Sequence, residues 1–155
     1  MLFRSNLSPE SLFSAVPAAA TAVRYDYVDG PRPTDGAGNT GQFLSGSFLV
    51  NFVNRSIGGS LNYRVDTVTY TLPVPATTPL VSRGGFVGFN VAGNNAGAWS
   101  CSCNGSSGTL DAYSVSGLFL GSRAQGLGVA FATDDTRVGR TAGVAIFRCN
   151  SGGCR

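Results

Sequence analysis

The 155-residue chain has 12% charged residues, 22 glycines and a net charge of +3 at pH 7. All eleven positive charges are arginines, spread from Arg4 to Arg155, so no basic stripe points to nucleic acid or to an anionic membrane surface. No run approaches the roughly 18 apolar residues of a membrane-spanning helix. The composition predicts one all-β domain that binds no nucleic acid and does not span a membrane.

Residues 1–41 are expected to form a linker, which contains one candidate strand. Its apolar run is too short for a signal peptide, because Pro17 interrupts it. The start is similar to a translated sequencing adapter, so we expect this chain to be part of a larger protein. Residues 22–29 alternate apolar Val23, Tyr25 and Tyr27 with mostly polar neighbours, as in a half-buried strand.

From Gln42 onward, turn signals recur about every 8 to 12 residues, which is typical of a sandwich or barrel. A shift in apolar phase predicts a two-residue hairpin turn at Asp66-Thr67. The three prolines of 73–79 predict a loop, because proline is excluded from central strands. The expected strands are 45–54, 60–65, 68–72, 84–92, 96–103, 112–120, 126–133 and 141–149.

Eight antiparallel strands can close on themselves, and we expect an eight-stranded antiparallel β-barrel over residues 42–149, followed by a tail at 150–155. A two-sheet sandwich is the structural alternative. A transmembrane barrel is not expected, because the outward parity carries Asn51, Asn62, Arg64 and Asp66 instead of a lipid-facing apolar band.

The four cysteines are candidates for disulfides. An even number of cysteines in a chain without histidine favours disulfides over zinc, and so predicts an oxidising compartment. Three connectivities are open, and the sequence does not choose among them. A redox pair or a copper site at the C-x-C motif is the alternative. The cysteines are Cys101, Cys103, Cys149 and Cys154.

Residues 115–131 resemble the Gly-x-Phe-x-Gly-x-x-Ala-x-x-x-Gly signature of the transferrin-binding-protein-B-type β-barrel. The variant at the C-terminus of FecR-domain proteins of Gram-negative bacteria is closer still, because a Cys/Gly-rich stretch precedes the signature and a Gly-Val-Ala-x-Phe strand follows it. Residues 101–105 and 143–147 stand in those two places. The signature residues, to which we assign a structural role, are Gly117, Phe119, Gly121, Ala124 and Gly128.

The resemblance implies a non-catalytic binding barrel of a bacterial envelope or surface protein. It further implies a protein partner, and a location in the periplasm or on the surface of a Gram-negative bacterium. Two alternatives stay open, namely a lipocalin-like barrel for a small ligand and an accessory domain of a FecR-type envelope signalling protein. A core filled by phenylalanines would exclude the lipocalin-like barrel; the candidates are Phe48, Phe52, Phe119, Phe131 and Phe147.

No catalytic, cofactor or metal site is predicted. The chain has no histidine and its single glutamate, Glu10, lies in the linker, so the common catalytic triads are excluded. Asp134 and Asp135 are interpreted as turn residues, with calcium binding as the alternative. Six aromatic residues are interpreted as core, with a ligand platform as the alternative; they are Tyr25, Tyr27, Tyr63, Tyr70, Trp99 and Tyr113.

Overall fold

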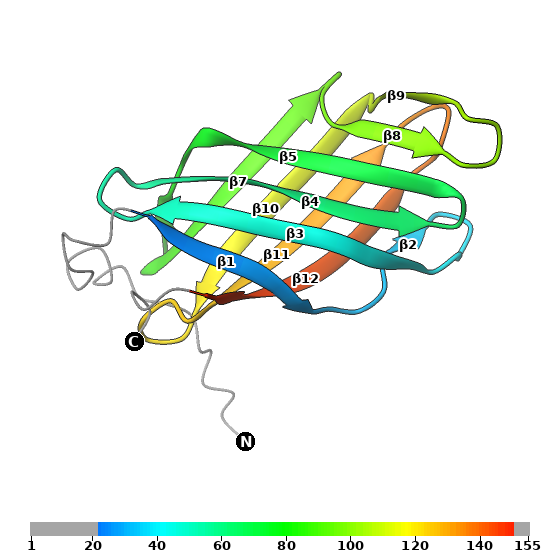
Figure 1. The fold of residues 1–155 in the computed structure, drawn as a ribbon. Helices are drawn as coiled ribbons and strands as arrows, with labels where there is room; N and C mark the ends of the chain where they lie inside the picture. Colours follow the sequence, from blue (N-terminus) through cyan, green and yellow to red (C-terminus); the bar gives the residue numbers. More distant parts are fainter. Residues whose placement is uncertain (1–21, 151–155) are drawn as a thin grey trace.

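Twelve strands make up one antiparallel sheet in the computed structural model, which describes residues 22–150 (Figure 1). These residues contain no helix, and so none that is long and apolar enough to cross a membrane. The strands are β1 (Val23–Asp29), β2 (Thr34–Asp35), β3 (Gly41–Asn51), β4 (Ser56–Val65), β5 (Val68–Pro79), β6 (Val81–Arg83), β7 (Phe86–Asn94), β8 (Ala98–Cys101), β9 (Ser107–Thr109), β10 (Ala112–Leu120), β11 (Gly126–Asp134) and β12 (Thr141–Cys149).

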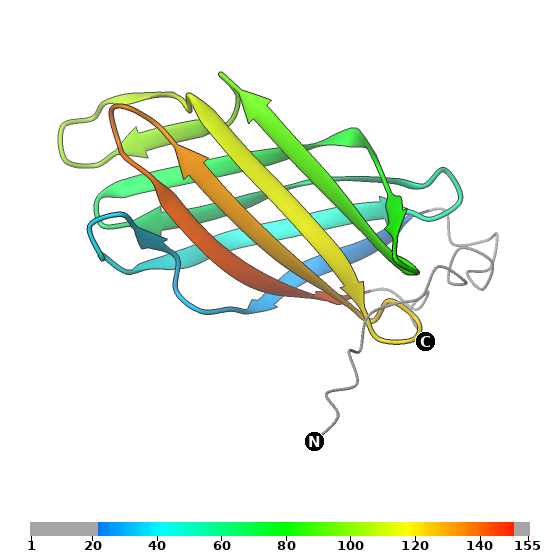
Figure 2. The ribbon, with the colours of Figure 1, turned by 180° about the vertical axis from the view of Figure 1, so that it is seen from behind.

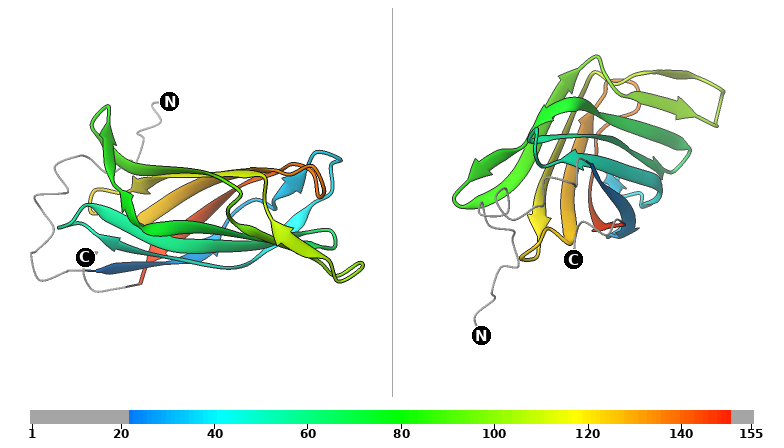
Figure 3. Two further views of the ribbon diagram at one scale, coloured as in Figure 1. Left: turned by 90° about the horizontal axis from the view of Figure 1, so that it is seen from above. Right: turned by 60° about the vertical axis from the view of Figure 1, so that its left-hand side comes forward.

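The sheet curls so that β3, β4 and β5 lie across from β7, β10 and β11, with the core between them (Figures 1 and 3). The strand order is β6-β7-β10-β11-β12-β1-β3-β4-β5-β8-β9, and the short β2 pairs with β12. β5 and β7 approach each other on the open side. The hydrogen-bonded path of the described strands nevertheless ends at β6 and β9, so they form a curled, incompletely closed barrel.

The all-β antiparallel prediction is confirmed, but the strand count of eight is wrong. The candidate strand at 22–29 is confirmed as β1, and the structure adds β2, β6 and β9 to the expected strands. β1 is central, because it lies between β12 and β3, inside the range assigned to the linker. β6 and β9 have only three residues each, too short for apolar alternation to be visible in the sequence. The expected boundaries of linker, barrel domain and tail stay a prediction.

β5 contradicts the expected proline-rich loop, because it continues through the three prolines to Pro79. Its pairing with β8 stops at Thr71, so beyond that residue β5 has no ladder on its β8 side and proline is tolerated there. A register shift opposite Ile57 and Gly59 takes up the extra length of β5. The hairpin turn at Asp66-Thr67 is confirmed, since Val65 pairs with Val68 across it.

Aromatic rings fill the space between the two halves of the sheet. Phe48 and Phe147 meet at 4.9 Å between ring centroids, and Tyr63 lies 4.6 Å from Phe131 and stacks on Tyr70 at 4.9 Å. The interpretation of the tyrosines and Trp99 as core is confirmed for all except Tyr27, which is partly buried. The five phenylalanines named above are all buried. The centre of the barrel is therefore occupied by side chains.

Glycines that face the core make room for aromatic rings on the neighbouring strand. Gly117 of β10 pairs with Phe89 of β7, and a Cβ added to Gly117 would lie 2.4 Å from Phe89 Cε1. The ring therefore lies directly over the glycine backbone, a packing that any larger residue would prevent. The same pairing recurs between Gly93 and Tyr113 and between Gly143 and Phe131.

We expect Gly117→Ala to destabilise the barrel by about 1–3 kcal/mol, because the new methyl group must displace the ring of Phe89. The measurement is the free energy of unfolding from urea titrations. Gly128→Ala is the matched control. A Cβ there would meet its nearest atom, Leu120 Cδ1, at 3.6 Å, which is an ordinary contact. Equal destabilisation by the two substitutions would contradict this explanation of the glycines.

Candidate functional site

Four of the five signature residues serve the core or a turn. Gly117 packs beneath Phe89, and Phe119 is buried in the core. Gly121 begins the turn between β10 and β11 with a positive φ of 83°. Ala124 is fully buried in the same turn, and its carbonyl oxygen accepts a hydrogen bond of 2.7 Å from the hydroxyl of Tyr25. These positions support the predicted structural role of the signature.

Gly128 differs from the other signature residues because it faces outward. The first four outward positions of β11 are small, namely Gly126, Gly128, Ala130 and Ala132, whereas Leu127, Val129 and Phe131 point into the core. Space inside this chain does not explain the glycine at 128, since a Cβ there would make only ordinary contacts. Glycine within a strand also marks places where another backbone approaches closely.

Gly128 and Ala130 of β11 lie in the floor of an apolar groove on the outer face of the sheet, the side that faces the viewer in Figure 2. One cross-strand row of outward residues runs Val81, Gly88, Leu118, Gly128 and Ile146. Large and absent side chains alternate along this row. Gly88 is buried beneath the side chain of Leu118, whereas Gly128, on the other side of Leu118, is partly exposed and leaves a trough. We call this surface the β11 groove; its volume is about 580 Å³.

Large apolar side chains stand exposed in the walls of the β11 groove. Leu118 on β10 is 44% exposed, and Val144 and Ile146 on β12 are 43% and 36% exposed. Contiguous exposed apolar surface of this kind marks interaction sites. Among the described residues that line the groove, Arg83 of β6 is the only charged one. The groove is thus a mainly apolar surface with one arginine in its lining.

Sequence reasoning missed the β11 groove. It assigned Gly128 to the fold together with the other signature glycines, and it did not consider Leu118, Val144 or Ile146 as a site. The sequence of β11 did contain a signal for the groove. Four consecutive outward positions are glycine or alanine, whereas the inward positions between them carry large side chains.

Asp134 and Asp135, the alternative calcium ligands, are each held by an arginine. Asp134 forms an exposed salt bridge with Arg140 at 2.9 Å. The buried carboxylate of Asp135 accepts hydrogen bonds from the side chain and backbone of Arg137 and from the backbone N–H of Asp111. Within residues 22–150 no three potential ligands from His, Cys, Asp and Glu lie together as a metal site would need.

Arg137 connects the β11–β12 turn with the β8–β9 end of the sheet. Its guanidinium lies over the ring of Trp99 on β8, at 5.3 Å from the ring centroid. It also donates hydrogen bonds to the carbonyl of Thr109 and to the carboxylate of Asp111. The Asp135–Arg137 pair thereby connects the β11–β12 turn with the β8–β9 hairpin, where no strand ladder does so among the described residues.

The pKa of Asp135 reflects this network. Burial raises the pKa of Asp135, but the hydrogen bonds from Arg137 and from backbone N–H groups outweigh burial and lower the pKa to about 2. The carboxylate is therefore ionised in the folded barrel throughout the neutral range. Burial alone raises the pKa of Tyr25, and it dominates the increase at Tyr63. These groups behave as structural residues and not as acids or bases.

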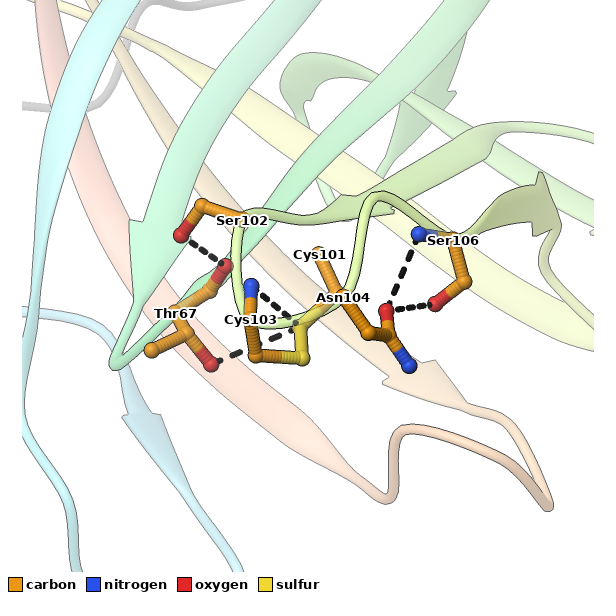
Figure 4. The surroundings of a disulfide bond; sticks show 6 residues. All are labelled: Thr67, Cys101, Ser102, Cys103, Asn104 and Ser106. Carbon is orange, nitrogen blue, oxygen red and sulfur yellow. Dashed lines mark hydrogen bonds between the residues drawn. A yellow bond between two sulfur atoms is a disulfide. The ribbon is translucent and has the colours of Figure 1, made fainter.

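Cys101 is bonded to Cys103 in the turn between β8 and β9 (Figure 4). This pairing excludes a bridge from the C-x-C motif to the C-terminal cysteines. Cys149 is also disulfide-bonded, and Cys154 lies outside the described residues. With a sequence separation of only 2, the Cys101–Cys103 bridge links no distant elements. The chain-entropy treatment gives such a three-residue loop about 1.6 kcal/mol, against about 3 kcal/mol for a loop of 15 residues.

Comparison with known proteins identifies the fold. No protein-family model matches the chain, and no curated protein does. Among solved structures it is similar to isotype 1 transferrin-binding protein B from serogroup B Neisseria meningitidis, with a TM-score of 0.57 and 18% identity. The fold resembles a transferrin-binding protein B barrel. The match covers 94% of this chain and 27% of the meningococcal protein, so the chain spans about a quarter of that protein's length.

A second similar structure is a mutant of the vaccine antigen transferrin-binding protein B from Haemophilus parasuis Hp5. It has a TM-score of 0.43 and 15% identity, over 83% of this chain and 26% of its own. The resemblance found in the signature residues is therefore confirmed for the fold by the meningococcal structure, whereas the association with FecR domains stays a prediction.

We expect the barrel to lose stability in acid through Asp135. Its folded pKa lies below its unfolded value of 3.8, so the stabilisation is complete above that pH and disappears as the pH falls toward 2. The difference amounts to about 2 kcal/mol. Asp135→Asn should lower the free energy of unfolding at pH 7 and flatten its dependence on pH between 5 and 2.

Asp26→Asn is the control for this experiment. Asp26 is more exposed, and its salt bridge with Arg24 holds its pKa below the usual value as well. Because solvent screens an exposed pair, we expect a much smaller change for this variant. Urea unfolding at several pH values measures both variants, and an unchanged pH dependence in Asp135→Asn would contradict the role of the network.

Proposed function

We propose that this barrel is a non-catalytic protein-binding module of a bacterial envelope or surface protein, and that it binds its partner through the β11 groove. The observation that carries the proposal is the outward glycine floor of β11 between exposed Leu118 on one side and Val144 and Ile146 on the other. A strand with small side chains on its outer face and large side chains on its inner face allows a second polypeptide to approach closely.

Because side chains fill the interior of the barrel, binding on its outer surface is favoured over binding in an internal cavity. A lipocalin-like barrel needs an open apolar cavity, whereas here Phe48, Phe119 and Phe147 are buried in the core together with Phe52 and Phe131. Their rings contact other aromatic rings across the barrel. A ligand of any size would have to displace several of these side chains. The small-ligand alternative therefore receives no support.

A binding role is favoured over catalysis by the residue types present. The described residues include no histidine and no glutamate. Asp111 and Asp135 share Arg137 at the barrel end. None of the residues within 22–150 that line the β11 groove carries a carboxylate. The groove thus offers apolar contact surface and no acid, base or nucleophile.

Charge at one end of the groove suggests the chemistry of the partner. Arg83 lines the groove, Arg148 follows Ile146 along the outer face of β12, and Arg123 lies in the adjoining β10–β11 turn. None of these three guanidinium groups has a carboxylate partner among the described residues. A protein surface that is apolar at its centre and acidic at one edge would complement this arrangement.

The envelope location rests on the disulfides and on the resemblance. Disulfide-bonded Cys101, Cys103 and Cys149 favour an oxidising compartment such as the periplasm or the cell surface. The similar meningococcal protein is named for binding transferrin. An accessory role beside a FecR-type domain is the second form of the proposal, and the coding sequence upstream of Met1 would test it.

Filling the groove should abolish binding without unfolding the barrel. Gly128→Phe places a ring in the trough beside Leu118, at an outward strand position that aromatic residues tolerate well. Ser100→Phe, on the exposed face of β8 and outside the groove, is the matched control. We expect a partner captured from Gram-negative envelope extracts by the wild-type barrel and by the control, but not by Gly128→Phe. Far-UV circular dichroism verifies that all three are folded.

Cross-linking tests directly whether the captured partner contacts the β11 groove. Photoreactive groups at position 118 should label the captured protein, whereas the same groups at position 100 should not. Capture that survives Gly128→Phe, or cross-links that form only at position 100, would place the binding surface elsewhere and refute the proposed site.

A further inference from the structure

We propose that Cys101 and Cys103 form a thiol–disulfide exchange site that oxidises dithiols of other polypeptides. The proposal is independent of partner binding at the β11 groove, because it concerns the tip of the β8–β9 hairpin. That hairpin lies at one end of the barrel (Figure 1). Hydrogen bonds hold the hairpin in place without the disulfide, the two cysteines differ in exposure, and two donors lie close to the sulfur of Cys101.

The hairpin is held in place without the disulfide. The backbone N–H of Cys101 donates to the carbonyl of Ser106 at 2.7 Å, and the N–H of Gly105 donates back to the carbonyl of Cys101 at 3.1 Å. The N–H of Ser102 donates to the carbonyl of Thr67 at 3.0 Å and so fixes the loop to the β4–β5 turn. The loop therefore has a defined conformation that does not depend on the bridge, and breaking the bridge leaves these bonds intact.

The two cysteines differ in accessibility. Cys101 is 7% exposed and belongs to the core, whereas Cys103 is exposed in the turn. An incoming thiolate therefore has access to the sulfur of Cys103. Neighbouring residues hinder its approach little, because no residue from 96 to 110 is charged and the tip of the turn consists of Ser102, Asn104 and Gly105.

The buried sulfur is equipped to leave as a thiolate. Cys101 Sγ accepts a hydrogen bond of 3.2 Å from the backbone N–H of Cys103, and it lies 3.6 Å from Thr67 Oγ1 (Figure 4). A disulfide sulfur carries no proton, so the Thr67 hydroxyl is the donor. Two donors aimed at one sulfur favour its negative charge, and a stabilised leaving thiolate accelerates exchange.

The reaction follows from this asymmetry. A substrate thiolate attacks Cys103 Sγ, a new intermolecular S–S bond forms, and the Cys101–Cys103 bond breaks with its electron pair on Cys101 Sγ. The second thiolate of the substrate then attacks the sulfur of its own mixed disulfide, and Cys103 leaves as a thiolate. The substrate dithiol has lost two electrons to the C-x-C pair, and both cysteine thiolates take up protons from solvent.

Glutathione tests the site in the full chain. We equilibrate the protein with buffers of increasing reduced-to-oxidised glutathione ratio, quench and alkylate it, and measure the modified cysteines by mass spectrometry. Cys101 and Cys103 should become alkylated together at ratios that leave Cys149 unlabelled and the near-UV circular dichroism unchanged. Labelling only after unfolding, or at the same ratio as Cys149, would overturn the proposal.

Single variants identify the sulfur that is attacked. Cys101→Ser should form a mixed disulfide between Cys103 and glutathione at least tenfold faster than Cys103→Ser forms one at Cys101, and equal rates would overturn the assignment. Thr67→Val removes the hydroxyl donor and should slow reduction of the bridge severalfold, with an unchanged unfolding midpoint; an unchanged reduction rate would contradict the leaving role of Cys101. A synthetic dithiol peptide should yield one peptide disulfide per wild-type barrel and none per Cys101→Ser/Cys103→Ser barrel.

Discussion

The fold depends on fitting large aromatic rings inside a curled sheet of about 130 residues. A sheet that curls on itself brings inward side chains from several strands into one narrow space, and rings cannot fill it if every cross-strand neighbour also carries a side chain. The chain solves this by placing a glycine opposite the ring. Phe89 lies over Gly117 and Phe131 over Gly143, so the backbone of one strand becomes the surface on which the ring of the next packs. The glycines lose conformational entropy in a strand, and the packed rings compensate for it.

Glycines on the two faces of the sheet have different roles. At Gly117 a methyl group would collide with a ring, whereas at Gly128 it would meet only ordinary contacts. Packing within the barrel requires glycine at position 117, whereas it does not explain the glycine at position 128. This difference separates a structural residue from a candidate contact residue within one short signature, and it cannot be seen without knowing which neighbour lies opposite each position.

The sequence predicted the strand content well and the sheet edges poorly. Alternating apolar residues located β3, β4, β10, β11 and β12, and the phase shift located the hairpin turn at Asp66-Thr67. The three-residue strands β6 and β9 carry too few positions for alternation, and β5 passes through its prolines because one of its edges is free. These features depend on which strand lies alongside, a property of the folded sheet and not of any local segment.

For the candidate sites, too, the sequence indicated residue types but not their partners in space. The cysteines were recognised as disulfide formers, but their pairing depends on the turn that brings Cys101 and Cys103 together. Asp134 and Asp135 were interpreted as turn residues, whereas the buried network of Asp135 with Arg137 and Asp111 joins segments 24 residues apart and left no pattern in the sequence. The groove was missed because residues of five strands, β6, β7, β10, β11 and β12, form it together.

The floor of the β11 groove is main chain at Gly128, and this limits how the surface can vary. A substitution there can only add atoms, so the trough at that position can be narrowed or filled but never deepened. Other barrels of this fold can therefore be sorted from sequence alone: a bulky residue at the position equivalent to Gly128 indicates a flat outer face, and a glycine there indicates that the trough is kept.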